Sequence, residues 1–195
     1  MDRTTARGDA ARRRHQVVVV GSGFGGLFTT QALKGADLDV TLIAKTTHHL
    51  FQPLLYQVAT GILSQGEIAP STREILGRQR NSRVLLGEVT DIDLTDHTVT
   101  SWVLGQAAVT AYDSLVVAAG AGQSYFGHDQ FARFAPGMKS IDDALELRGR
   151  IFASFEMAEL ADSEQQRTRL MTFVVVGDKA KIEESLKPYP PGAEK

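Results

Sequence analysis

A glycine-rich turn that directly follows an apolar stretch constrains this chain more than any other feature. Residues 15–26 read His-Gln-Val-Val-Val-Val-Gly-Ser-Gly-Phe-Gly-Gly, which predicts a buried strand, the spacing G-x-G-x-x-G and a helix over 24–33. Gly21 permits the tight turn, Gly23 lets the backbone approach a phosphate, and Gly26 lets the helix pack closely on the strand. Because the helix would point unpaired N–H groups and its positive end at an anion, the pattern predicts a dinucleotide pyrophosphate site.

Composition narrows the possible functions without defining one. The chain has 195 residues, a formal net charge of −2 and no cysteine, which argues against nucleic-acid binding, disulfides and thiolate metal sites. No stretch approaches the roughly 20 apolar residues that a membrane span needs. Residues 1–14 carry five arginines but no apolar segment. We interpret them as a flexible basic tail rather than a secretory signal or a membrane-binding arm, and expect a cytoplasmic protein.

Alternating strand and helix patterns predict an α/β fold. Apolar runs over 39–43, 82–86 and 114–119 predict further strands of a parallel sheet. Three short, turn-separated runs predict an inserted antiparallel β-meander over 88–92, 98–104 and 108–112. We therefore expect a Rossmann-like parallel sheet in a domain over 15–177, followed by a divergent tail over 178–195.

The later part of the domain is expected to be helical and then to return to a strand. Ser140 and Asp143 have the spacing of a capping box before a helix that reaches about residue 160. A polar loop and a last strand over 171–177 would follow. The helix has apolar residues at helical spacing that we expect in the core: Ile141, Ala144, Leu145, Ile151, Phe152 and Phe155.

Three segments would meet at the carboxyl edge of the sheet, where open α/β sheets bind their ligands. They are residues 21–26, 44–45 and 118–120. The connection over 46–61 is long and apolar, so we expect it to pack over the ligand, with Pro53 favouring a helix start. With a meander inserted before the last strand, this order resembles the FAD domain of flavoproteins that bind two dinucleotides.

The run from His49 to Gly61 makes the resemblance specific. It reads His-Leu-Phe-Gln-Pro-Leu-Leu-Tyr-Gln-Val-Ala-Thr-Gly. With Val-Leu-Leu-Gly-Glu-Val from Val84 and Tyr-Asp-Ser-Leu-Val-Val-Ala-Ala-Gly from Tyr112, it resembles the type II, non-proton-pumping NADH:quinone oxidoreductases. The resemblance covers residues 15–177, the N-terminal part of such an enzyme. It implies a bound FAD that accepts hydride from NADH and passes electrons to a membrane quinone, and the lack of cysteine agrees with this rather than with a disulfide reductase.

The resemblance also implies which residues contact FAD. The glycine-rich turn would hold the pyrophosphate, Val89 would meet the adenine through its backbone, and the end of the 114–119 strand would pass close to the cofactor. Gln52 and Pro53 would lie near the isoalloxazine and the approach of the quinone. No catalytic side chain and no metal ligand is assigned. The implied cofactor-binding residues are Gly21, Ser22, Gly23, Phe24, Gly25, Gly26, Lys45, Gln52, Val89, Ala119 and Gly120.

One departure concerns the end of the second strand. An acidic residue usually stands there, about 20 residues past the glycines, and binds the adenosine ribose. Here the positions are Ala44 and Lys45, whereas Asp37 and Asp39 lie at the start of that strand. Lys45 could contact the adenine ribose or its phosphate, but it would also permit a 2′-phosphate. An NAD(P)-binding Rossmann protein and a non-catalytic fragment therefore remain alternatives.

Two adjacent histidines in the same loop raise the question of a metal. They are residues 48 and 49, and the sequence offers no third ligand at a useful spacing. We therefore interpret them as ordinary loop histidines.

A second departure lies at the end of the domain. In the resembled enzymes the strand that ends at Gly177 continues into a second glycine motif for NADH, but here Asp178 and Lys179 follow. A lysine side chain would fill the space of a pyrophosphate, so we expect a truncated chain that retains only FAD binding. Alternatively, Asp178 could end a return strand and hydrogen-bond the ribityl region.

The resembled enzymes contact the cytoplasmic face of the membrane through C-terminal elements that we expect this chain to lack. Whether the chain forms a homodimer stays open.

Overall fold

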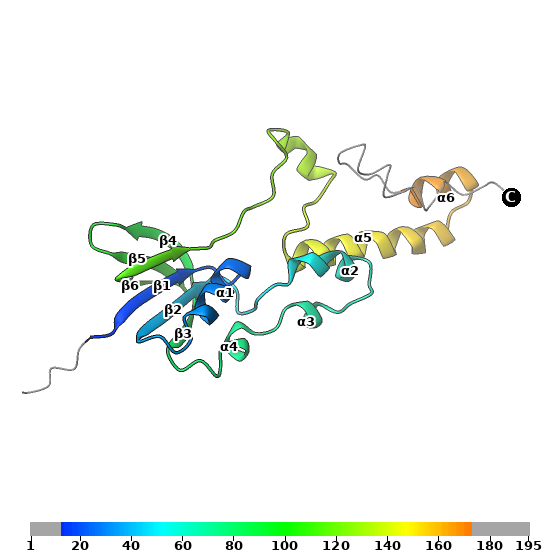
Figure 1. The fold of residues 1–195 in the computed structure, drawn as a ribbon. Helices are drawn as coiled ribbons and strands as arrows, with labels where there is room; N and C mark the ends of the chain where they lie inside the picture. The colour runs from blue at the N-terminus through cyan, green and yellow to red at the C-terminus, as the bar shows by residue number, and fades with distance from the viewer. Residues whose placement is uncertain (1–12, 173–195) are drawn as a thin grey trace, which may run out of the picture. The chain divides into compact units, whose positions relative to one another are not determined.

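The structure is a computed structural model that describes residues 13–172. The chain divides into two compact units, of which the first ends at Arg148 and the second begins at Gly149. Each unit is considered by itself. The strands of the described residues, which are labelled in Figure 1, all belong to the first unit. Within the described residues, no helix has the length and apolar character needed to cross a membrane.

A parallel sheet of four strands forms the centre of the first unit. Its order is β3-β2-β1-β7, and all three neighbouring pairs are parallel. The strands are β1 (His15–Val20), β2 (Leu38–Ala44), β3 (Ser82–Leu86) and β7 (Ser114–Val117), which confirms the expected parallel sheet. The chain runs outward from β1 to β2 and β3, and β7 then lies on the other side of β1. The order therefore reverses between β1 and β7, where α/β sheets open a crevice at their carboxyl edge.

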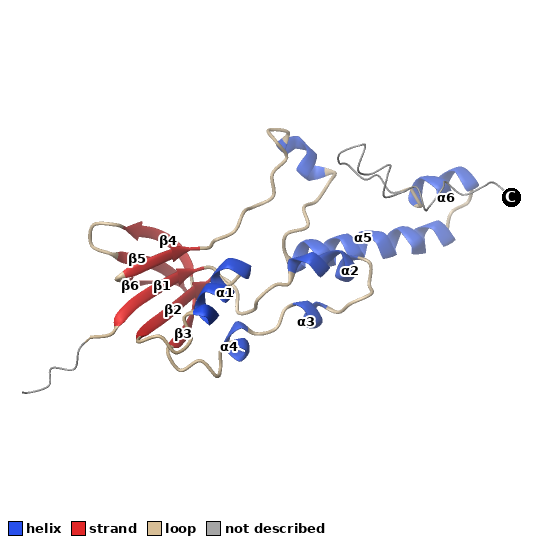
Figure 2. Cartoon of the chain, in the orientation of Figure 1, coloured by secondary structure: helices blue, strands red, loops and turns tan. Residues whose placement is uncertain are grey.

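The two faces of the sheet are covered by different elements (Figure 2). The strands β4 (Glu88–Asp93), β5 (Thr98–Val103) and β6 (Gln106–Ala111) form the expected antiparallel meander. Val18 and Val20 pack with Val99 of the meander, whereas Val19 faces α1 (Phe24–Ala32). Successive side chains of a strand point to opposite faces of the sheet. Because both faces are covered at β1, all four consecutive valines of this strand are buried.

The long connection after β2 is helical and has an apolar core of its own. Its elements are a 3-10 turn over Gln52–Leu54, α2 (Leu55–Ala59), α3 (Gln65–Ile68) and α4 (Thr72–Ile75). Leu55 and Val58 are fully buried against Ile68 and Ala144. Pro53 lies in the first turn of the 3-10 segment, as its fixed φ favours. The short α3, which the sequence analysis did not anticipate, is closed by a capping box between Ser64 and Glu67.

The helix α5 (Ile141–Glu159) begins at the expected capping box. The Ser140 N–H donates to Asp143 at 2.8 Å, and the Asp143 N–H donates to the Ser140 hydroxyl at 3.2 Å. Ala144 is buried, but Leu145, Phe152 and Phe155 are 37%, 43% and 43% exposed. The expectation that these three belong to the core was therefore wrong, because helical spacing marks one face of a helix without showing what covers it.

The segment after α5 corrects a second expectation. It contains α6 (Glu164–Leu170) instead of a polar loop. Ser163 caps this helix, because its hydroxyl accepts the Gln166 N–H at 3.2 Å. Of the strand expected over 171–177, residues 173–177 lie outside the described residues, as do Asp178 and the tails over 1–12 and 178–195.

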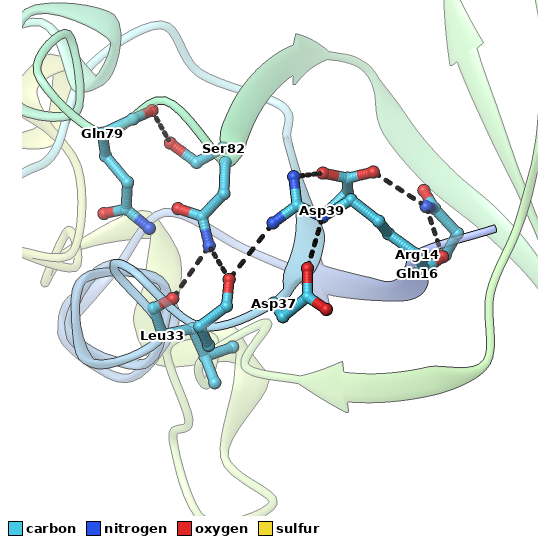
Figure 3. Close-up of polar contacts among 9 residues, drawn as sticks. Arg14, Gln16, Leu33, Asp37, Asp39, Gln79 and Ser82 are labelled. Carbon is cyan, nitrogen blue, oxygen red and sulfur yellow. Dashed lines mark hydrogen bonds and ion pairs between the residues drawn. The ribbon is translucent and has the colours of Figure 1, made fainter. Parts of the chain in front are cut away.

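Hydrogen bonds tie together the amino edge of the sheet, opposite the predicted ligand edge (Figure 3). The Arg14 guanidinium donates to Asp39 at 2.9 Å, Asp37 at 3.1 Å and the Ala36 carbonyl at 3.2 Å. Asn81 donates to the same Ala36 carbonyl at 3.3 Å. The two aspartates at the start of β2 thus hydrogen-bond within the amino edge of the sheet. This agrees with the prediction that they do not bind the ribose at the opposite edge.

Asp113 holds β1 and the start of β7 together at this edge. Its carboxylate accepts the Gln16 N–H at 2.7 Å and lies 3.2 Å from the Arg13 guanidinium. The hydrogen bond from Gln16 lowers the pKa of Asp113, desolvation opposes it, and the Arg13 charge adds to the lowering. A lowered folded pKa stabilises the protein above the ordinary aspartate range, and this contribution is lost as pH falls through the folded pKa.

Asp113→Asn is therefore expected to lower the melting temperature at neutral pH and to flatten its dependence on pH below the ordinary aspartate range. Thermal unfolding of both proteins between neutral and acidic pH measures this. Asp91→Asn is the control, because it makes the same change of side chain at an exposed position of β4. Parallel curves for Asp113→Asn and the unsubstituted chain would contradict the assignment.

Candidate nucleotide-binding site

The glycine-rich loop at the end of β1 is built around two glycines that the fold itself requires. Gly21 has a φ of +101°, in the region that side chains avoid. A Cβ at Gly21 would also overlap with the Ala118 carbonyl at the end of β7. A Cβ at Gly26 would overlap with the carbonyl oxygen of Gly21. These two positions therefore fix the turn and the close approach of α1 to β1.

Gly23 differs, because nothing in the fold requires a glycine there. Its φ is −68°, and a Cβ built on it meets no atom within 4 Å. The N–H groups of residues 23–26 donate no hydrogen bond to the described part of the chain, the first helical bond being that from Leu27 to Gly23. No side chain caps α1, and its first turn has no acidic residue. Unpaired N–H donors and the positive helix end thus lie beside the open space at Gly23, as an anion site requires.

The carboxyl ends of β2, β1 and β7 lie side by side around this loop. The Gly21 N–H donates to Ile43 of β2 at 2.8 Å, and the Ala118 N–H donates to Val20 of β1 at 2.8 Å. The position of a Cβ on Gly25 lies 3.5 Å from the Ala118 Cβ. Residues 119 and 120, which follow directly, are exposed. The structure therefore brings the glycine-rich loop together with the end of β7.

Lys45 lies at the same edge, directly after β2. Its side chain is exposed, whereas that of Ala44 is buried. The end of β2 thus presents a cation where related folds place a carboxylate. A cation here is suited to a phosphate or a ribose hydroxyl of a nucleotide that extends along the edge from the glycine-rich loop.

The remaining predicted contacts are less closely gathered. The Phe51 ring lies 5.4 Å from the Phe24 ring, which places the exposed Gln52 and Pro53 near the start of α1. Val89, on β4, is half-buried and packs in the core between the sheet and the meander. The contact of its backbone with the adenine, which the resemblance implies, stays a prediction.

His49 is the neighbour of the site that the sequence analysis missed. It is 6% exposed, and its Nδ1 lies 2.8 Å from the Ser22 carbonyl. The ring also meets that of Phe24 edge-on at 5.1 Å. In the described part of the chain, no group of three or more His, Cys, Asp or Glu is arranged to hold a metal. The apolar residues that follow His49 indicate that this segment is buried. They do not indicate the hydrogen-bond partner of His49, because the Ser22 carbonyl belongs to a distant part of the sequence.

A surface hollow of about 540 Å³ lies at the other edge of the sheet. Its lining includes Arg13, Arg14 and His15 with two aspartates, and their side chains bond to one another or to Ser114. The hollow is therefore structural, and the glycine-rich loop remains the better candidate for a ligand.

The strand order and the glycine-rich loop define a Rossmann-type α/β fold, the class that binds nucleotides at its carboxyl edge. The family described as pyridine nucleotide-disulphide oxidoreductase matches residues 15–177. The chain belongs to this family of oxidoreductases.

Individual relatives are more specific. The chain is 67% identical over 165 residues to the type II NADH:quinone oxidoreductase Ndh of Mycobacterium tuberculosis, covering 85% of this chain and 36% of the relative. It is 68% identical over 164 residues to NdhA of the same organism, covering 84% and 35%. The chain thus spans about a third of the length of these curated relatives. A solved structure of NDH2 from Plasmodium falciparum in complex with NADH has a TM-score of 0.69 and 29% identity, covering 80% of this chain and 32% of that one.

Proposed function

We propose that this chain binds FAD at the carboxyl edge of its parallel sheet, as the N-terminal part of a type II NADH:quinone oxidoreductase. The observation that carries the proposal is Gly23, which lies beside unpaired N–H groups and open space although the fold does not require a glycine there. The names of the 67% and 68% identical relatives support the activity.

We propose that different residues of the site contact different parts of FAD. The backbone of residues 21–26 would hold the pyrophosphate, and Lys45 would contact the adenosine end. Ala119 and Gly120 would leave room along the end of β7, and the Val89 backbone would meet the adenine. Gln52 would lie toward the isoalloxazine. When bound, FAD would supply the chemistry of accepting hydride from NADH and passing electrons to quinone. These residues would bind and orient the cofactor.

The purified chain is expected to be yellow, or to become yellow when FAD is added and the excess removed. Visible absorbance of the retained flavin and a titration by flavin fluorescence measure this. A folded chain that neither retains nor binds FAD would contradict the proposal.

A second candidate ligand is NADPH, because the exposed Lys45 after β2 would permit a 2′-phosphate. In that case the protein would be colourless, and NADPH would raise its melting temperature more than FAD does. The same thermal shift series with FAD, NADPH and NADH therefore separates the two candidates. A chain that responds to none of them would favour a role in association with a partner.

NADH and a quinone are the substrates that we propose for the complete enzyme. The support is the name of the mycobacterial relatives and the NADH complex of the Plasmodium protein. We also propose that the complete enzyme works at the cytoplasmic face of the cell membrane.

A further inference from the structure

A buried histidine is hydrogen-bonded to the backbone of the glycine-rich loop. The Nδ1 of His49 lies 2.8 Å from the Ser22 carbonyl oxygen. Since a carbonyl oxygen only accepts, Nδ1 carries the hydrogen and donates it. In the other direction, the Ser22 hydroxyl donates to the His48 carbonyl at 3.2 Å. Two segments more than 20 residues apart in the sequence are therefore joined by two hydrogen bonds.

The backbone of His49 is anchored on its other side. Its N–H donates to the Pro70 carbonyl at 3.0 Å, and the Phe51 N–H donates to the Ile68 carbonyl at 2.8 Å. The imidazole packs edge-on against the Phe24 ring, with an interplanar angle of 88°. A side chain held by its own backbone and by ring packing has little freedom, so it can fix the group to which it bonds.

The bond to His49 sets the direction of the Gly23 N–H. The Ser22 carbonyl and the Gly23 N–H belong to one planar peptide and point in opposite directions. With its oxygen held toward His49, this peptide directs the Gly23 N–H away from the histidine, and the N–H has no acceptor among residues 13–172.

We propose that His49 is a positioning residue, which orients the Ser22–Gly23 peptide so that the Gly23 N–H donates to a bound pyrophosphate. The role rests on the proposed function, because it concerns binding of the same dinucleotide. His49 itself touches neither the cofactor nor the reacting atoms.

Two variants of the full chain separate the N–H donor of His49 from its ring. His49→Phe keeps an aromatic ring but has no donor, whereas His49→Asn keeps an N–H close to the Nδ1 position without the ring. Loss of one hydrogen bond that orients a phosphate donor is expected to weaken FAD and ADP binding about tenfold in His49→Phe. The affinity of His49→Asn for FAD and ADP should remain within about threefold of that of the unsubstituted chain. Losing about half the free energy of one hydrogen bond changes an affinity by about this factor.

The control is His15→Phe, which removes a histidine contact of similar length, 2.9 Å to Ser114, at the opposite edge of the sheet. Its affinity for FAD and ADP should equal that of the unsubstituted chain. Melting temperatures of the ligand-free proteins are measured in parallel, since a purely structural role would lower stability without changing the affinity of the folded fraction. His49→Leu, which also lacks the donor, replaces His49→Phe if the ring disturbs folding.

Equal affinity of the donor-less variants and the unsubstituted chain would overturn the positioning role. So would a loss in His49→Asn as large as that in His49→Phe, because a retained N–H donor would then fail to preserve the affinity. If the unsubstituted chain binds FAD, either result leaves the proposed function intact. If the unsubstituted chain binds none of FAD, ADP and NADPH, both proposals are wrong.

Discussion

Gly26→Ala is expected to destabilise the chain by about 3 kcal/mol or more, the upper range for overpacking of a well-packed interior. The added Cβ would overlap with the Gly21 carbonyl oxygen, which is backbone and is itself fixed by the turn at the end of β1. Alanine also favours a helix over glycine by about 1 kcal/mol. The steric effect outweighs this gain, because relieving it requires moving α1 away from the strand. Urea unfolding of the ligand-free chain measures the difference.

Gly25→Ala is the matched control, since the two glycines are adjacent in the same helix. A Cβ at Gly25 would meet only the Ala118 Cβ, at an ordinary contact distance of 3.5 Å. This variant should therefore be as stable as the unsubstituted chain, or more stable by up to about 1 kcal/mol. Equal stability of the Gly25 and Gly26 variants would show that α1 does not depend on its close approach to β1.

The sequence predicted the sheet well because its signals are local and strong. Four consecutive valines can be satisfied only where both faces of a strand are buried, and β1 is such a strand. The meander was equally predictable, since turn residues separate its three runs. In contrast, the tetrapeptide helix α3 and the helix α6 carry too few residues for helical periodicity to stand out.

The site was predictable only where a residue type itself carries the information. Glycine at positions 21 and 26 reports a backbone that tolerates no side chain, and the structure supplies the reason for both. The bond of His49 to the loop carries no such signal, because a histidine that donates to a distant carbonyl has no characteristic spacing. The prediction that the apolar positions of α5 are all buried was wrong for a similar reason. What covers Leu145 depends on long-range packing that periodicity does not encode.

Gly23→Ala is expected to abolish tight nucleotide binding while leaving the fold unchanged. The φ of −68° suits alanine, and no atom lies within 4 Å of the added Cβ. Stability should therefore be unchanged, or increased by about 0.4–1 kcal/mol, because alanine restricts the unfolded chain. The same methyl group would stand in the space beside the N–H donors. If it prevents two hydrogen bonds to a charged phosphate, affinity for FAD falls by about 3 kcal/mol, about a hundredfold.

Gly66→Ala provides the comparison for this variant, because a Cβ at Gly66 also meets no atom within 4 Å but lies in α3. Both variants should unfold at or above the urea midpoint of the unsubstituted chain, and only Gly23→Ala should lose FAD in a fluorescence titration. Full FAD affinity in a folded Gly23→Ala protein would show that the pyrophosphate does not approach this position. The open space beside α1 would then need another explanation, since the fold requires glycine at positions 21 and 26 but not at 23. A loss of stability in Gly23→Ala alone would instead make its glycine a requirement of folding, which the unobstructed Cβ position argues against.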